Sequence, residues 1–215
     1  MQNGTDTLFG GEQIPIRPVL CDFDTDNGNF SKNSPWMPVI MTDLISFSRL
    51  LNKTEGKQRP KLNPLDYTET LLSLLYRIVE APSPSPASVK SGESFHNVIN
   101  LSMLAFMTTL LPEYTRDHSS CPLLACRLGS AVQDMCDTTS KSSELDLPFL
   151  WVLFVSGISV LNIKDHYLLA PFIRRICKRL QLDNWVAIQQ EISWFPWIFV
   201  LHETPGRLLW ERCMA

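Results

Sequence analysis

The chain has 215 residues, enough for one domain with a full hydrophobic core but short for two. Hydrophobic residues make up 45% and charged residues 19%, and the formal net charge is -3. This charge gives no general attraction to nucleic-acid phosphates, and no basic face dominates the sequence. Composition therefore excludes a typical basic DNA-binding module and predicts a single globular domain.

Residues 1–36 are polar, rich in Gly, Asn and Asp, and show no helical period, so we expect a loosely ordered arm. Their start has neither the basic nor the apolar segment of a signal peptide, which argues against secretion. We expect one helical domain over residues 37–215. Within it, the stretch from Lys53 to Lys61 predicts a solvated basic loop, with a nuclear-import signal as the alternative.

Apolar residues at helical spacing predict seven to nine helices and no strand, which is an all-α fold of the irregular-bundle type. The first helix is expected after Pro38. The second should begin at Pro64, with Asn63 as its N-cap and an apolar face over Leu71, Leu72, Leu75, Ile78 and Val79. A Pro/Ser-rich internal loop over residues 82–93 follows. Further helices are expected over residues 95–111 and 121–135.

Residues 147–160 are apolar on every face, which predicts the central helix. The next helix should begin at Pro171, with a basic side of Arg174, Arg175, Lys178 and Arg179 that is solvated or else contacts an acidic partner. Asn184 is expected to cap a helix that buries Trp185. Thr204-Pro205 is expected to cap a short final helix.

The six cysteines show no C-x-x-C pair and no repeated spacing, so we expect reduced structural thiols. Their positions are Cys21, Cys121, Cys126, Cys136, Cys177 and Cys213. The one membrane candidate, residues 147–161, is too short for a bilayer span and indicates a buried core helix.

The acidic run Asp22, Asp24 and Asp26 is the strongest enzymatic signal. It resembles the nucleophile motif of haloacid-dehalogenase-type phosphatases, but Asp26 stands where that motif has Thr or Val. Read as a calcium loop, it has Asn27 where Gly is needed and Asn33 where a bidentate Glu is needed. A disordered acidic turn is the better interpretation.

Two further motifs are incomplete. His202-Glu203 begins like a zinc-protease motif, but Gly206 takes the place of the second histidine. Gly157-Ile-Ser159 begins like a nucleophile elbow, but Leu161 takes the place of the closing glycine. We therefore predict a non-catalytic protein with no catalytic, cofactor-binding or metal-binding residues.

The aromatic residues near the C-terminus are expected to fill the core, with lining of an apolar ligand pocket as the alternative. They are Trp151, Trp185, Trp194, Phe195, Trp197, Phe199 and Trp210.

Several features over residues 147–212 occur in one order. Leu150-Trp151 and Phe154-Val155-Ser156-Gly157-Ile158 come first, then Arg174 and Arg175, Trp185, Glu191, Trp194-Phe195-Pro196-Trp197 and Gly206-Arg-Leu-Leu-Trp210. This order resembles the fungal-specific transcription factor domain, the C-terminal regulatory region of fungal zinc binuclear cluster factors. The likeness is weaker from residue 38 to 146, and the six-cysteine zinc cluster does not occur in the chain.

The resemblance implies a helical regulatory domain in the nucleus (or else in the cytoplasm) that binds a protein partner or a small apolar effector. Without the zinc cluster, direct specific nucleic-acid binding is not expected, and neither is membrane association. The alternative is a helical domain recruited as a small-molecule binder or enzyme in fungal specialised (secondary) metabolism. That alternative predicts a closed apolar cavity with polar groups such as His96, Asn100 or His202.

Overall fold

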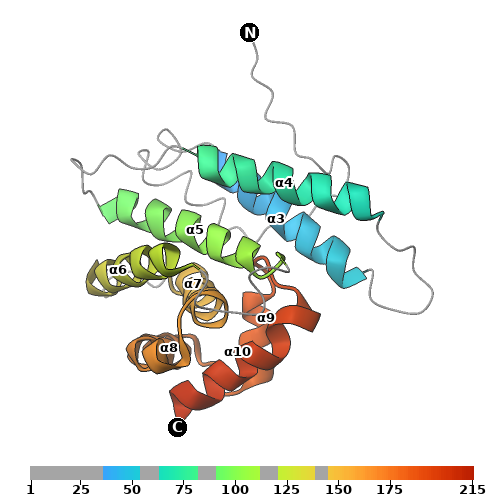
Figure 1. The fold of residues 1–215 in the computed structure, drawn as a ribbon. Helices are drawn as coiled ribbons and strands as arrows, with labels where there is room; N and C mark the ends of the chain where they lie inside the picture. The colour runs from blue at the N-terminus through green and yellow to red at the C-terminus, as the bar shows by residue number, and fades with distance from the viewer. Residues whose placement is uncertain (1–35, 54–62, 82–90, 112–120, 139–144) are drawn as a thin grey trace.

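The computed structural model describes residues 36–53, 63–81, 91–111, 121–138 and 145–215. These ranges hold eight α-helices, one short 3-10 helix and no strand (Figure 1), so the predicted all-α fold of seven to nine helices is confirmed. The predicted N-terminal arm, apart from its last residue Trp36, lies outside the described residues, as do the Asp22–Asp26 run and residues 54–61 of the basic loop.

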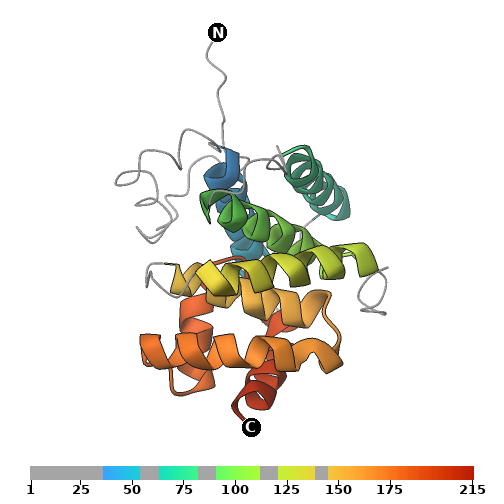
Figure 2. The ribbon, with the colours of Figure 1, turned by 90° about the vertical axis from the view of Figure 1, so that its left-hand side faces the viewer.

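Four helices form the N-terminal part of the molecule. They are α3 (Trp36–Lys53), α4 (Pro64–Glu80), α5 (Ser91–Thr108) and α6 (Pro122–Thr138). Helix α5 packs against α3, α4 and α6 and also contacts α7 of the C-terminal part. Both ribbon views place α5 between α4 and α6 (Figures 1 and 2), which leaves α4 at the edge of the molecule.

The C-terminal part is built around one central helix. It comprises α7 (Asp146–Ser159), the 3-10 helix Ile163–Asp165, α8 (His166–Leu180), α9 (Trp185–Ile192) and α10 (Phe199–Met214). Helix α7 packs against α5, α6, α8, α9 and α10. Every residue of α7 except Leu147 is buried, which confirms the predicted central helix.

The second predicted helix begins as expected but buries a different face. The Asn63 side chain accepts a hydrogen bond from the Leu65 N–H at 3.1 Å, so Asn63 caps α4 as predicted. Its buried residues are Leu71, Leu74 and Ile78. Leu72 and Val79 of the predicted face are exposed. The prediction was wrong here because it did not place α4 at an edge, where neighbours cover one side only.

Residues 82–90 of the predicted internal loop lie outside the described residues, and residues 91–93 belong to α5, which begins at Ser91. The last proline of this segment is Pro86, so the backbone of residues 91–93 is free to continue a helix. Once packing fixes the rest of α5, each added residue gains a helical hydrogen bond without a new nucleation step.

Two predicted helix starts at prolines were also wrong. Helix α8 begins at His166 and α10 at Phe199, so Pro171 and Pro205 lie inside helices. An internal proline costs about 3 kcal/mol, since it removes one hydrogen bond and crowds the preceding turn. The buried stripes continue across both prolines and offset this cost; that of α10 runs through His202, Gly206, Leu209 and Cys213.

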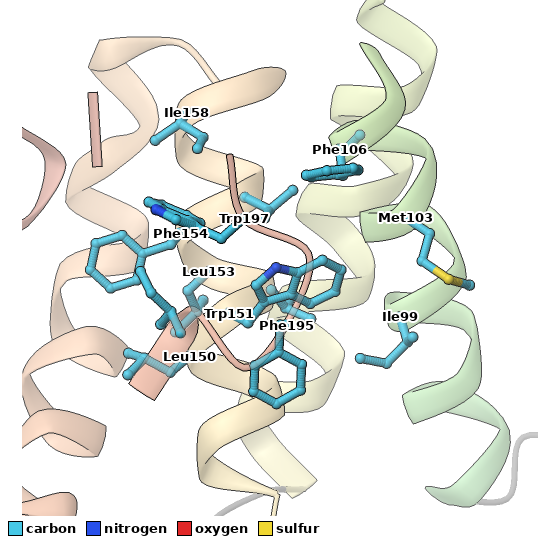
Figure 3. Close-up of a cluster of buried hydrophobic side chains, with 14 of the residues drawn as sticks. Ile99, Met103, Phe106, Leu150, Trp151, Leu153, Phe154, Ile158, Phe195 and Trp197 are labelled. Atoms are coloured by element: carbon cyan, nitrogen blue, oxygen red, sulfur yellow. The ribbon is translucent and has the colours of Figure 1, made fainter. Parts of the chain in front are cut away.

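Aromatic rings link the helices at the centre. Trp151 stacks on Phe195 at 5.8 Å between ring centroids, and Phe154 lies 5.7 Å from Trp185. Trp185 in turn lies 6.4 Å from Trp197. Trp151 and Trp197 are among the largest fully buried side chains. Figure 3 shows part of this cluster, where α5, α7 and the segment that carries Trp197 meet. The predicted core role is confirmed for Trp151, Trp185, Phe195 and Trp197. It is wrong for Phe199, which is exposed, while Trp194 and Trp210 are only partly buried.

Candidate functional site

The tryptophan-rich turn, residues 193–198, joins α9 to α10 and is held by polar contacts from two distant helices. The Trp151 Nε1–H on α7 donates to the Pro196 carbonyl at 3.0 Å. From α3, the Asn52 amide donates to the Trp197 carbonyl at 2.8 Å and accepts from the Phe199 N–H at 3.0 Å. These bonds satisfy backbone groups that a turn cannot pair by itself. Asn52 thus joins the first described helix to the last.

His202 lies in the first turn of α10 and is almost wholly buried. Its Nδ1 accepts from the Ile198 N–H at 3.0 Å, and its Nε2 lies 2.9 Å from the Thr109 hydroxyl. The Thr109 hydroxyl donates to the Phe106 carbonyl at 2.7 Å, so Nε2 carries the proton and donates to Thr109. Phe106 and Trp197 cover the ring, with centroids 5.3 Å and 5.0 Å away.

Burial lowers the pKa of His202 to about 3, because the charged imidazolium would lose its water. The ring is therefore neutral at physiological pH, and both nitrogens are engaged within the protein. His202 acts as a polar link between α10 and the end of α5. It is closed to substrate in this arrangement.

The neighbouring Glu203 points elsewhere. Its carboxylate accepts from the Trp185 Nε1–H at 2.7 Å and from the Gln189 side-chain amide. Successive helical side chains are about 100° apart, so His202 and Glu203 face different neighbours. The sequence spacing already argued against a zinc-protease motif at this pair, and the different directions of the two side chains give that motif no support.

The predicted solvated basic side of α8 is only partly solvated. The Arg174 side chain donates to the Cys213 carbonyl, and Arg179 forms an ion pair with the buried Asp146 at the start of α7. Arg175 lies over the Phe172 ring at 5.4 Å. Burial raises the pKa of Asp146, while Arg179 and Arg175 oppose that shift. This basic side therefore clamps α8 to α7 and α10.

A second ion pair repeats the arrangement in the N-terminal part. The Arg77 guanidinium on α4 donates to Asp43 on α3 at 2.6 Å, and the Asp43 side chain is wholly buried. Neither pair was predicted, and neither was the role of Asn52. Each contact joins residues on different elements that are more than 30 positions apart, and sequence spacing carries no signal for such a pairing.

Cys121, Cys126, Cys177 and Cys213 are free thiols, as expected for reduced structural cysteines. Burial raises the pKa of Cys177 to about 12 and that of Cys213 to about 11. A thiol becomes a nucleophile or metal ligand only as the thiolate, so these two behave as apolar side chains. Among the described residues, no group of three His, Cys, Asp or Glu side chains could hold a metal ion.

The remaining serine candidate also has a packing role. Gly157 lies inside α7, where a Cβ would come within 2.6 Å of the Leu209 side chain, so glycine permits the close approach of α10. The Ser159 hydroxyl donates to the Val155 carbonyl one turn earlier. A nucleophile elbow needs a turn between strand and helix, whereas both residues are in mid-helix or at its end.

The described surface includes three open clefts. One, of about 600 Å³, lies between the end of α7, the start of α8 and α10, with Lys164, Asp165 and Arg212 among its lining residues. A second, of about 380 Å³, lies beside the tryptophan-rich turn and Asn52. The third, of about 310 Å³, is lined mostly by apolar residues of α4, α5 and α6.

None of the three polar residues expected to line a ligand cavity borders one of these clefts. His96 and His202 are buried, and Asn100 is partly buried with its Oδ1 enclosed. Trp194, Phe195 and Trp197 do border the second cleft, although Phe195 and Trp197 are buried. None of the three expected polar residues therefore lines one of these clefts, and only aromatic residues of the predicted set border one.

Comparison with models of known protein families, with curated proteins and with solved structures gave no match. Within the described ranges, no helix has both the length and the apolar content needed to cross a membrane.

Proposed function

We propose that this chain is a non-catalytic, transcription-regulatory interaction domain without a DNA-binding module of its own. It works in the nucleus and acts through a protein partner, such as a full-length regulator or co-regulator. The proposal starts from the resemblance of residues 147–212 to the fungal-specific transcription factor domain.

The observation that carries the proposal is the packing of this region. The features of the resemblance, from Trp151 to Trp210, belong to one unit in which α8, α9 and α10 surround α7. The Trp151–Pro196 hydrogen bond and the Trp151–Phe195 stack connect the first and later parts of the pattern directly. This packing fixes how the outer faces of α8, α9 and α10 lie relative to one another, which suits binding of a partner.

A tethering assay tests the proposal. The full chain is fused to an unrelated DNA-binding domain whose operator stands upstream of a reporter gene in a fungal host. We expect the fusion to raise or lower reporter output relative to the DNA-binding domain alone. A fusion that carries Trp151→Ala, which removes a core side chain, should return output to that baseline. Baseline output from a folded, nuclear wild-type fusion would contradict the proposal.

A second candidate function, small-molecule binding, is favoured by the cleft of about 600 Å³. Its lining includes the apolar residues Leu161 and Leu208 together with Lys164 and Arg212. Asp165 also lines it, which leaves one more cation than anion, a combination suited to apolar carboxylates. Equilibrium dialysis with a labelled long-chain fatty acid tests this reading. Binding should be lost in Leu208→Asp and kept in Leu201→Asp, an exposed position on the same helix that does not line the cleft. Equal binding by both variants would count against it.

A further inference from the structure

Helix α4 carries apolar side chains on the face turned away from its buried residues. Leu65, Leu72, Tyr76 and Val79 are exposed by 70%, 44%, 63% and 63%. Their spacings of seven, four and three residues place them along one line of an α-helix. We call these four residues the α4 stripe. Single exposed apolar side chains are ordinary, but an aligned set beside polar residues is typical of a protein-binding surface.

The α4 stripe continues into the apolar cleft of about 310 Å³. Leu75 lies on α4 between the buried face and the stripe, and it lines that cleft. The other walls come from α5, including Leu104, and from α6, including Leu123, which is 66% exposed. Stripe and cleft together form one apolar surface that runs along α4 and faces outward beside α5 and α6.

The two long edges of this surface differ in charge. Asp66, Glu69 and Glu80 are exposed and lie on the side of the α4 stripe away from the cleft. The only basic residue of α4, Arg77, is paired with the buried Asp43. Arg127 on α6 is exposed and lines the opposite, cleft edge. The surface is therefore acidic along one edge and has a cation on the other.

We propose that the α4 stripe and its cleft bind an amphipathic α-helix of a partner protein, with Lys or Arg along the edge that meets Glu69 and Glu80. The stripe extends over 14 residue steps, about 21 Å at 1.5 Å per residue, so a partner helix of about four turns matches it. An antiparallel pairing with α4 of a second copy would bring the two acidic edges together, which disfavours that arrangement.

This inference gives the partner chemistry of the proposed interaction domain and rests on that function for its biological meaning. It also goes beyond it, because binding in solution requires no promoter or nucleus. Peptide binding with no reporter effect would refute the regulatory role and keep the docking surface. A reporter effect with no peptide binding would refute the docking surface and keep the regulatory role.

The test uses the full chain and a labelled synthetic peptide of about 16 residues, with Leu at helical spacing and Lys along one edge. A matched peptide replaces each Lys by Glu. Fluorescence anisotropy should show the Lys peptide binding at least about tenfold more tightly, with the difference shrinking at high salt. Equal affinity for both peptides would overturn the proposal.

Variants locate the site. Leu72→Ser with Val79→Ser should weaken binding of the Lys peptide by about tenfold or more, since the two substitutions remove half of the apolar side chains of the α4 stripe. Glu69→Lys with Glu80→Lys should reverse the preference toward the Glu peptide. The matched control, Val186→Ser with Val200→Ser, removes two exposed apolar residues of α9 and α10 and should change nothing.

Circular dichroism melting of each variant checks that the fold persists, as expected for substitutions at exposed positions. Unchanged peptide binding by the folded Leu72→Ser, Val79→Ser variant would overturn the assignment. Sedimentation that finds a wild-type dimer, dissociated by the same two substitutions, would make a second copy the occupant and would overturn the heterotypic partner.

Discussion

Helices α7 and α4 are both rich in apolar residues, yet they meet very different surroundings. Neighbouring helices cover α7 on every side, and twelve consecutive residues from Pro148 to Ser159 are buried. At the edge of the molecule, α4 buries Leu71, Leu74 and Ile78 but exposes the α4 stripe. Burial thus depends on position in the helical array as much as on composition. An apolar face without a neighbour is free for a partner.

The largest expected contrast is between one aromatic residue on each of these helices. Trp151→Ala should lower the free energy of unfolding by about 3–5 kcal/mol, because it leaves a cavity and frees the Pro196 carbonyl. Tyr76→Ala should change it by less than about 0.5 kcal/mol, since Tyr76 is exposed. Urea unfolding followed by tryptophan fluorescence and by circular dichroism measures both. Similar losses in the two variants would mean that α4 is covered in solution.

Two glycines, one in each part of the molecule, compare how closely the C-terminal and N-terminal parts are packed. At Gly206 a Cβ would lie 2.9 Å from the Trp185 ring and 3.0 Å from the Trp197 ring. Gly206→Ala should therefore destabilise by about 1–3 kcal/mol. At Gly129 on α6 no atom lies within 4 Å, so Gly129→Ala should stabilise by about 0.5–1 kcal/mol through helix propensity.

Thermal melting of the two alanine variants and the wild type shows whether each substitution raises or lowers the melting temperature. The glycine comparison fails if both substitutions shift the melting temperature in the same direction.

The third prediction tests the contact between the two parts, where His202 of α10 meets Thr109 after α5. Burial lowers the pKa of His202 to about 3 from the ordinary 6.5. Between these values the unfolded chain binds a proton that the folded chain does not, so stability falls as pH falls. The slope from this one group is at most about 1.4 kcal/mol per pH unit.

His202→Asn removes the titrating ring and keeps an acceptor for the Ile198 N–H. The free energy of unfolding is measured in urea at pH 6.5 and at pH 5 for both proteins. Between these pH values the wild type should lose about 1–2 kcal/mol more than the variant, because only the wild type carries the titrating ring. Parallel pH dependence of the two proteins would show that His202 titrates normally and is open to water.

The last comparison concerns the helix caps, one in each part of the molecule. Asn63 accepts from the Leu65 N–H on α4, and Asn184 accepts from the Ala187 N–H on α9 at 2.9 Å. Each Asn→Ala substitution should lower the free energy of unfolding by about 1 kcal/mol. A loss at Asn184 but none at Asn63, measured by chemical unfolding, would show that the N-terminus of α4 frays in the native state.

Local patterns determined much of this fold. Runs of apolar residues at helical spacing identified the helices, the all-round apolar residues 147–160 identified the central one, and Asn63 and Asn184 marked two helix starts. These features depend on backbone hydrogen bonding and side-chain shape within a few residues, so they can be read along the chain.

Other features were decided only by the tertiary structure. Helices α8 and α10 run through Pro171 and Pro205 because burial of long apolar stripes offsets the local cost. The contacts of Asn52, the Asp146–Arg179 pair and the contact of His202 with Thr109 depend on residues brought together from different helices or their ends. The exposure of the α4 stripe depends on which helices lie beside α4, and sequence spacing does not encode which neighbours a helix will have.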